Sequence, residues 1–165
     1  MSKIRILIIG LGRIGKIHLA NLQAVDEVEI IGICDPTDEA KAFSNKAGLT
    51  FYQKDFTDVA SEVQTDAIVI CSPTDTHANY VSLAAKKGID VFCEKPLDLS
   101  LKKVKEVLKT VSESKIKLML GFNRRFDSEF QSVKEKIVKG EIGDIHMIKI
   151  TSRDPSPPPI NYIKS

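Results

Sequence analysis

The feature that most constrains this chain is a regular alternation of short apolar runs with segments of helical pattern. The apolar runs are rich in Ile and Val and do not alternate with polar residues, as in parallel strands covered on both faces. We predict strands at 4–9, 28–34, 67–71, 91–93 and 116–120, with a weaker strand at 49–52. Helices are predicted between them, at 14–24, 39–47, 56–62, 77–87 and 101–114.

This order predicts an α/β protein with a doubly wound parallel sheet, the Rossmann fold. Right-handed crossovers, with helices switching from one sheet face to the other, give the strand order 3-2-1-4-5-6. The first domain is therefore expected to span residues 1–121, where the regular alternation ends.

The pattern changes in residues 122–165. It predicts a longer amphipathic helix at 126–139, a strand at 145–152 and a proline-rich turn or extended segment at 154–159. About 45 residues rarely build an independent core, so we interpret this segment as the incomplete start of a second, α+β domain. Without its sheet, the strand would expose unpaired backbone groups, which predicts self-association or poor order there.

Composition excludes several classes of function. The 42% hydrophobic and 28% charged residues are typical of a folded globular protein. A net charge of +2 with interleaved signs predicts neither a nucleic-acid nor a membrane partner. The three cysteines lack metal or disulfide spacing, so no metal site is predicted. The apolar run at 4–9 is far shorter than the roughly 20 residues of a membrane span, and we expect a cytoplasmic protein.

A glycine motif opens the first predicted helix. Gly10, Gly12 and Gly15 form G-x-G-x-x-G directly after a strand, with Arg13 and Ile14 between the last two glycines. The first glycine permits a tight turn, the second lets a pyrophosphate approach the backbone, and the third allows close packing of helix and strand. Free N–H groups at the helix start favour an anion. These five residues are predicted to bind a dinucleotide; the alternative is a glycine turn without a ligand.

Asp35 ends the second predicted strand, about 20 residues after the last glycine. A carboxylate at this position accepts hydrogen bonds from the adenosine ribose hydroxyls and repels a 2′-phosphate, which favours NAD over NADP. The alternative is an aspartate that stabilises the turn before Pro36.

The fourth strand leads into a polar loop at the carboxyl end of the sheet, where open α/β folds bind ligands. Ser72, Thr74 and His77 of this loop are predicted to border the cofactor. In the alternative interpretation, Thr74 or Asp75 caps the next helix and His77 has a plain surface or capping role.

The fifth strand ends in Glu94-Lys95-Pro96, again at the carboxyl edge. A lysine there can polarise or deprotonate a substrate hydroxyl in a closed site. A cis bond before Pro96 would fix the direction of the lysine. The alternative is an ordinary solvated Glu-Lys pair.

Taken together, the glycine turn, Asp35, the polar loop and above all Glu94-Lys95-Pro96 resemble the Gfo/Idh/MocA family of NAD(P)-dependent sugar and polyol dehydrogenases. The likeness covers the whole chain. The segments 121–127 and 151–155 are most similar to the inositol 2-dehydrogenase branch of that family.

The resemblance implies hydride transfer from a ring carbinol of a polyol or sugar to NAD, giving a ketone. Lys95 would be the catalytic lysine and contact the substrate, while Glu94 would support the nicotinamide ribose or the lysine. Arg124 is a candidate substrate contact; the alternative is a solvated arginine leading a helix. The second domain of the family would make the full-length protein a homo-oligomer.

The chain departs from the family in length. Members are about twice as long, and their second domain supplies an Asp-x-x-x-His pair that completes proton transfer, which this sequence lacks. We therefore expect the chain to bind NAD and to turn over polyol poorly or not at all. The competing hypothesis is a non-catalytic NAD-binding module or sensor. A methyl-donor or other nucleotide site would leave Asp35 and Glu94-Lys95-Pro96 without an explanation.

Overall fold

A computed structural model describes residues 2–153, 156 and 157, and the chain divides into two compact units, Met1–Phe122 and Asn123–Ser165. The first unit contains a six-stranded parallel sheet of order β3-β2-β1-β4-β5-β6, which confirms the predicted order. Its strands are β1 (Ile4–Ile9), β2 (Val28–Cys34), β3 (Phe51–Tyr52), β4 (Ala67–Ile70), β5 (Asp90–Cys93) and β6 (Leu118–Leu120).

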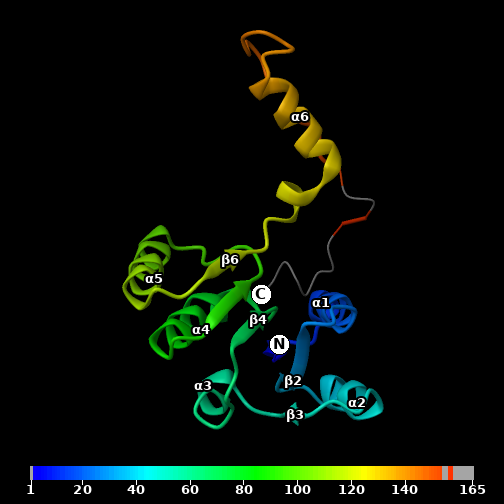
Figure 1. Cartoon of the computed structure of the whole chain (residues 1–165), viewed down its shortest axis with the longest axis vertical. Helices are drawn as coiled ribbons and strands as arrows, with labels where there is room; N and C mark the ends of the chain where they lie inside the picture. Colours follow the sequence, from blue (N-terminus) through cyan, green and yellow to red (C-terminus); the bar gives the residue numbers. More distant parts are fainter. Residues whose placement is uncertain (1, 154–155, 158–165) are drawn as a thin grey trace. The chain divides into compact units, whose positions relative to one another are not determined.

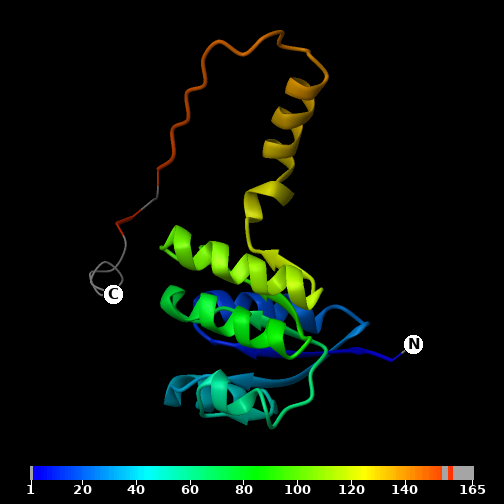
Figure 2. The ribbon, with the colours of Figure 1, turned by 90° about the vertical axis from the view of Figure 1, so that its left-hand side faces the viewer.

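Five helices cover the sheet. They are α1 (Arg13–Gln23), α2 (Asp38–Lys46), α3 (Phe56–Val59), α4 (Thr74–Lys86) and α5 (Leu101–Ser114). Figure 1 shows α1 and α2 on one side of the sheet and α3, α4 and α5 on the other, and Figure 2 shows α4 and α5 side by side. This is the switch of faces that right-handed crossovers require.

Three of the five helices of the first unit begin with a side-chain cap, and α1 and α4 do not. The side chains of Thr37, Asp55 and Ser100 accept backbone N–H bonds at the starts of α2, α3 and α5. Helix α4 starts three residues before the predicted 77, after Pro73, and has no side-chain cap. The prediction that Thr74 or Asp75 caps it was wrong, because both residues already lie in its first turn.

The core forms two layers because successive side chains of a strand point to opposite faces. Along β1, Leu7 and Ile9 pack into the layer beneath α3, α4 and α5. Ile6 and Ile8 pack into the layer beneath α1 and α2. The prediction that β1 is covered on both faces is therefore confirmed.

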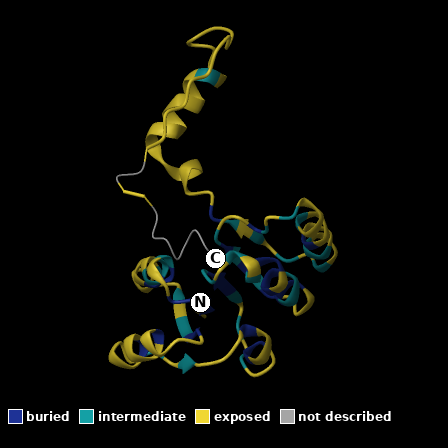
Figure 3. Cartoon of the chain, turned by 180° about the vertical axis from the view of Figure 1, so that it is seen from behind, coloured by how far each residue is buried: buried dark blue, intermediate teal, exposed yellow. Residues whose placement is uncertain are grey.

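The second unit contains a short 3₁₀ helix (Asn123–Phe126) and α6 (Ser128–Val138), which is capped by Asp127. Figure 3 shows exposed residues along most of α6. The predicted strand at 145–152 was wrong: the structure has no strand there. A strand needs a partner for its backbone groups, and none of the described residues pairs with this segment. The predicted turn at 154–159 lies largely outside the described residues.

Self-association remains expected for the second unit, through side chains rather than strand edges. Met147, Ile148 and Ile150 are 87%, 70% and 81% exposed. Clustered apolar exposure of this kind favours association. Changing these three to Gln, Thr and Thr is expected to weaken self-association by about tenfold or more, measured by sedimentation velocity over a range of concentrations. Lys134→Gln, a polar change on α6, is the control. Concentration-independent monomer behaviour of the unmodified chain would contradict the prediction.

No helix in the described part of the chain is long and apolar enough to cross a membrane. Nor do the described residues include a cluster of His, Cys, Asp or Glu able to hold a metal ion.

Candidate functional site

The first and third glycines of the motif are required by close backbone packing. Gly10 has φ of +86°, and a Cβ atom there would lie 2.6 Å from the amide nitrogen of Ser72. At Gly15, a Cβ atom would lie 2.1 Å from the carbonyl oxygen of Gly10. No side chain fits at either position. The glycine turn therefore packs closely against both α1 and the loop after β4.

The second glycine has a different environment. A Cβ atom at Gly12 would have no protein atom within 4 Å, so the space beside this residue is open. Gly12 is also the N-cap of α1, which Arg13 opens and Ile14 continues, and no side chain caps this helix start. An open cradle at a helix start with free N–H groups fits a pyrophosphate. The residues present therefore suit the predicted dinucleotide.

Asp35 is buried and holds two turns at once. One carboxylate oxygen accepts a 2.8 Å bond from the backbone N–H of Leu11, inside the glycine motif. The other accepts 2.8 and 2.6 Å bonds from the N–H and hydroxyl of Thr37. The turn-stabilising interpretation thus describes a contact that exists, and the sequence did not reveal the bond to Leu11. Contact of Asp35 with the ribose stays a prediction.

The polar loop after β4 is brought to the same edge of the sheet. The hydroxyl of Ser72 donates a 2.6 Å bond to that of Thr76, which donates to the carbonyl of Pro73. Thr74 is the half-buried first residue of α4. His77 is only 2% exposed, so the expected surface role was wrong, and its ring does not cap α4. Cofactor contact by these side chains stays a prediction.

The loop after β5 presents Lys95 to solvent and Glu94 to the protein. One oxygen of Glu94 accepts a 2.9 Å bond from Nε2 of His18, and the other accepts a 3.3 Å bond from the N–H of Lys95. Gly121 leaves room for this carboxylate, because a Cβ atom there would lie 3.0 Å from its oxygen. The Lys95–Pro96 peptide bond is cis. Of the two roles considered for Glu94, these contacts support that of stabilising the lysine loop.

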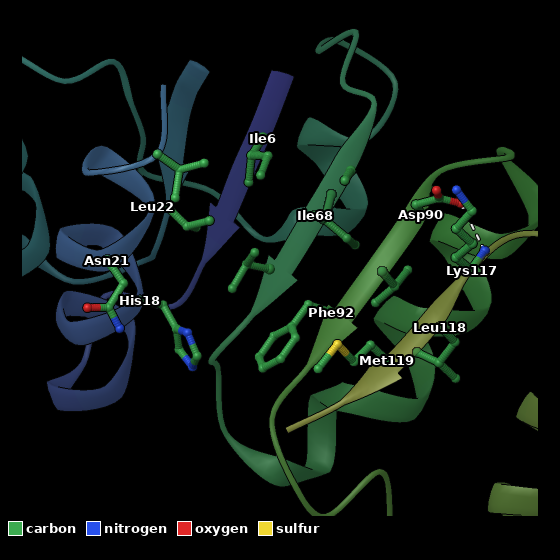
Figure 4. A pocket seen from close by; sticks show the side chains of 14 residues that line it. Ile6, His18, Asn21, Leu22, Ile68, Asp90, Phe92, Lys117, Leu118 and Met119 are labelled. Atoms are coloured by element: carbon green, nitrogen blue, oxygen red, sulfur yellow. Dashed lines mark hydrogen bonds between the residues drawn. The ribbon is translucent and has the colours of Figure 1, made fainter. Parts of the chain in front are cut away.

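Sequence reasoning missed His18. The residue lies on α1, and its ring centroid is 4.9 Å from that of Phe92 on β5. Figure 4 shows both rings at an apolar groove between α1 and strands β4 to β6. The available signal was spacing: His18 precedes Leu22 by four residues, so both occupy one helix face. The role of His18 follows only from the groups that its ring contacts in the folded protein, Glu94 and Phe92.

The groove also corrects one expectation about the sheet. The apolar strands were predicted to be covered on both faces, but Met119 of β6 is 45% exposed on this side. The crossovers place α4 and α5 on the opposite face, and no described helix of the first unit covers β5 and β6 here. The sheet is therefore doubly covered only in part.

The thiols near this edge are chemically quiet. Burial, with a smaller contribution from Glu94, raises the pKa of Cys71 to about 12. Burial first, then Cys71 and Glu94, raises the pKa of Cys93 to about 12. Both groups therefore stay protonated near neutral pH, which removes them as nucleophiles. Lys95, in the loop after β5, is exposed.

Arg124 belongs to the second unit and is exposed in its 3₁₀ helix. Its guanidinium lies 4.9 Å from the ring centroid of Phe130, a cation–π contact. The suggested contact of Arg124 with a substrate stays a prediction.

A doubly wound sheet with an open glycine cradle and a lysine at its carboxyl edge defines a dinucleotide-binding domain of the oxidoreductase class. Residues 4–122 match the model of the Gfo/Idh/MocA oxidoreductase family with its NAD-binding Rossmann fold. The chain belongs to this family.

Among curated relatives, the chain is 43% identical to an inositol 2-dehydrogenase of Rhizobium meliloti, over 98% of this chain and 48% of that protein. A solved myo-inositol dehydrogenase structure from Sinorhizobium meliloti, described as putative, superposes with a TM-score of 0.86 at 41% identity, over 98% and 49% of the two chains. The scyllo-inositol dehydrogenase of Lactobacillus casei, solved with NAD(H) and scyllo-inositol, gives 0.81 at 29% identity, over 87% and 43%. The chain thus spans about half the length of these relatives.

Proposed function

We propose that this chain is the NAD-binding half of a dehydrogenase that oxidises a ring carbinol of inositol or a related polyol or sugar. The observation that carries the proposal is the open space beside Gly12, in a turn whose other two glycines, Gly10 and Gly15, are closely packed against backbone. The names of the relatives support the substrate class. Three free cysteines suit a reducing compartment such as the cytoplasm.

Each residue has a definite part in this proposal. The start of α1 binds the pyrophosphate, and Asp35 binds the adenosine ribose. NAD, when bound, would supply the acceptor for the hydride of the carbinol carbon. Lys95, as the neutral amine, contacts the substrate hydroxyl and receives its proton, so that the ketone forms as the C–H electron pair leaves. Glu94, anchored by His18, keeps the lysine loop in place.

NAD is expected to be preferred over NADP. A 2′-phosphate beside Asp35 would meet a like charge. Lys16, a cation of α1, is already paired with Glu39 at 2.9 Å. The proposed substrate side is a small molecule, and we expect the full-length protein to be a homo-oligomer.

The test is a thermal-shift titration of NAD and NADP against the chain and its Gly12→Ala variant. NAD at 100 times its dissociation constant should stabilise the unmodified chain by about 2.7 kcal/mol. The alanine methyl group projects into open space, so unliganded stability should fall by less than about 1 kcal/mol, the difference between Gly and Ala at an N-cap. The NAD-induced shift should disappear. Equal stabilisation of both proteins would show that this cradle is not the binding site.

The competing hypothesis, a non-catalytic NAD-binding module, differs from the dehydrogenase in forming no NADH from a polyol. NADH formation from inositol that vanishes in Lys95→Ala supports the dehydrogenase. NAD binding with no NADH formation at high protein concentration supports either the non-catalytic module or a dehydrogenase half that is inactive by itself.

A further inference from the structure

His77 is the most deeply buried imidazole in the described part of the chain, at 2% exposure, and neither of its nitrogens faces solvent. Nδ1 lies 2.7 Å from the carbonyl oxygen of Pro96, and Nε2 lies 2.9 Å from that of Ser72. The ring therefore bridges the loop after β4 and the loop after β5. These are the two loops at the carboxyl edge of the sheet that border the proposed site.

The contacts of His77 indicate which of its ring nitrogens donates a hydrogen bond. Carbonyl oxygens only accept hydrogen bonds, so a ring nitrogen that bonds one must carry the proton. A neutral imidazole has one N–H, and we assign it to Nδ1, the nitrogen with the shorter contact, so that the ring donates to Pro96 and Nε2 only lies beside the carbonyl of Ser72. The donor belongs to a buried ring and Pro96 is otherwise exposed, so this bond ties the chain at Pro96 to the fixed helix α4.

The position of that carbonyl matters because Pro96 directly follows Lys95. On the other side of Lys95, the carboxylate of Glu94 is anchored by His18. The lysine backbone thus lies between two fixed neighbours, while its side chain stays exposed. Because the side chain of Lys95 is exposed, the protein positions its amine through contacts to the backbone.

The other end of the bridge reaches the cofactor turn. Ser72, whose carbonyl faces Nε2, has its amide nitrogen 2.6 Å from where a Cβ atom of Gly10 would be. A continuous set of packed groups therefore joins Gly10 to Lys95 through Ser72, His77 and Pro96. Displacement of a reacting group by about 1 Å can lower a rate by about 100-fold.

We propose that His77 is a positioning residue that sets the place of Lys95 relative to the glycine turn, by donating from Nδ1 to the carbonyl of Pro96. This role deepens the proposed function, since it matters for catalysis only if Lys95 acts on a substrate. It is an alternative to the predicted contact of His77 with the cofactor, because both ring nitrogens face backbone carbonyls.

Two conservative variants separate the two ends of the bridge. In His77→Asn the amide nitrogen can take the place of Nδ1 and keep the bond to Pro96. In His77→Gln it can reach the place of Nε2, beside the carbonyl of Ser72, and does not take the place of Nδ1 at Pro96. A residue that merely fills a buried polar space would make the two variants equivalent.

The readout is the backbone order parameter of Lys95 from ¹⁵N relaxation of the full chain. It should stay at about 0.85 in the unmodified chain and in His77→Asn, and fall below about 0.6 in His77→Gln. Thermal unfolding of each variant monitors the fold. Equal order parameters at Lys95 in the two variants, whether high or low, would overturn the proposal.

A measurement on the unmodified chain covers the case in which a variant does not fold. A scalar coupling across the hydrogen bond, between Nδ1 of His77 and the carbonyl carbon of Pro96, should be detectable. An Nδ1 without a proton would overturn the proposal. NAD titration of the same samples tests the proposed function separately, because the order of Lys95 is measured without ligand.

Discussion

Replacing Gly15 by alanine is expected to lower the free energy of unfolding by about 3 kcal/mol, the upper part of the usual range for overpacking. The added methyl group would lie 2.1 Å from the carbonyl oxygen of Gly10, far inside van der Waals contact. That oxygen belongs to backbone and cannot rotate away. Relief therefore requires α1 to move off β1, which breaks the packing of Leu19 in the core.

Thermal unfolding measures this effect as a fall in Tm of about 10 °C for a domain of this size. Gly12→Ala is the matched control, since the same methyl group there meets open space. The two variants differ by position within one motif and not by chemistry. Similar Tm values for both would mean that helix and strand are not packed as closely at Gly15 as the structure has them.

Asp35→Ala is expected to have a second large effect, a loss of about 3 kcal/mol or more in unfolding free energy. Its carboxylate accepts three hydrogen bonds, from Leu11 and from two groups of Thr37, and hydrogen bonds to a charged group contribute about 1.5–3 kcal/mol each. The truncation leaves the buried N–H of Leu11 without its acceptor. Chemical denaturation with urea measures the change in stability.

Thr37→Val is the control, because it removes the 2.6 Å hydroxyl bond to Asp35 and leaves the bond from Leu11 intact. It also removes the cap of α2, so a smaller loss of about 1 kcal/mol is expected. An Asp35→Ala chain as stable as the unmodified one would refute the turn-supporting role.

This dual role changes how cofactor experiments at Asp35 are interpreted. The carboxylate is the predicted ribose contact, but it also holds Leu11 inside the glycine turn. Loss of NAD binding in Asp35→Ala therefore follows from either role. Gly12→Ala tests ligand binding separately, because the added methyl group meets no protein atom within 4 Å.

The fold was largely predictable because its signals are local. Strand order followed from apolar runs, the spacing of helices and the handedness of crossovers, which need no knowledge of distant contacts. The glycine motif was readable for the same reason: Gly10, Gly12 and Gly15 lie in six consecutive residues. The strand at 145–152 failed because strand formation depends on a partner that local pattern cannot supply.

The sequence by itself thus determined the sheet, the glycine turn, and the placing of Asp35 and Lys95 at strand ends. Only the tertiary structure decided which groups meet there. The bond from His18 to Glu94 joins residues 76 positions apart, and those from Leu11 to Asp35 and from His77 to Pro96 join residues 24 and 19 apart. Such pairs are set by how helices and loops pack around the sheet, and a hydrogen bond forms only where that packing brings donor and acceptor within about 3 Å.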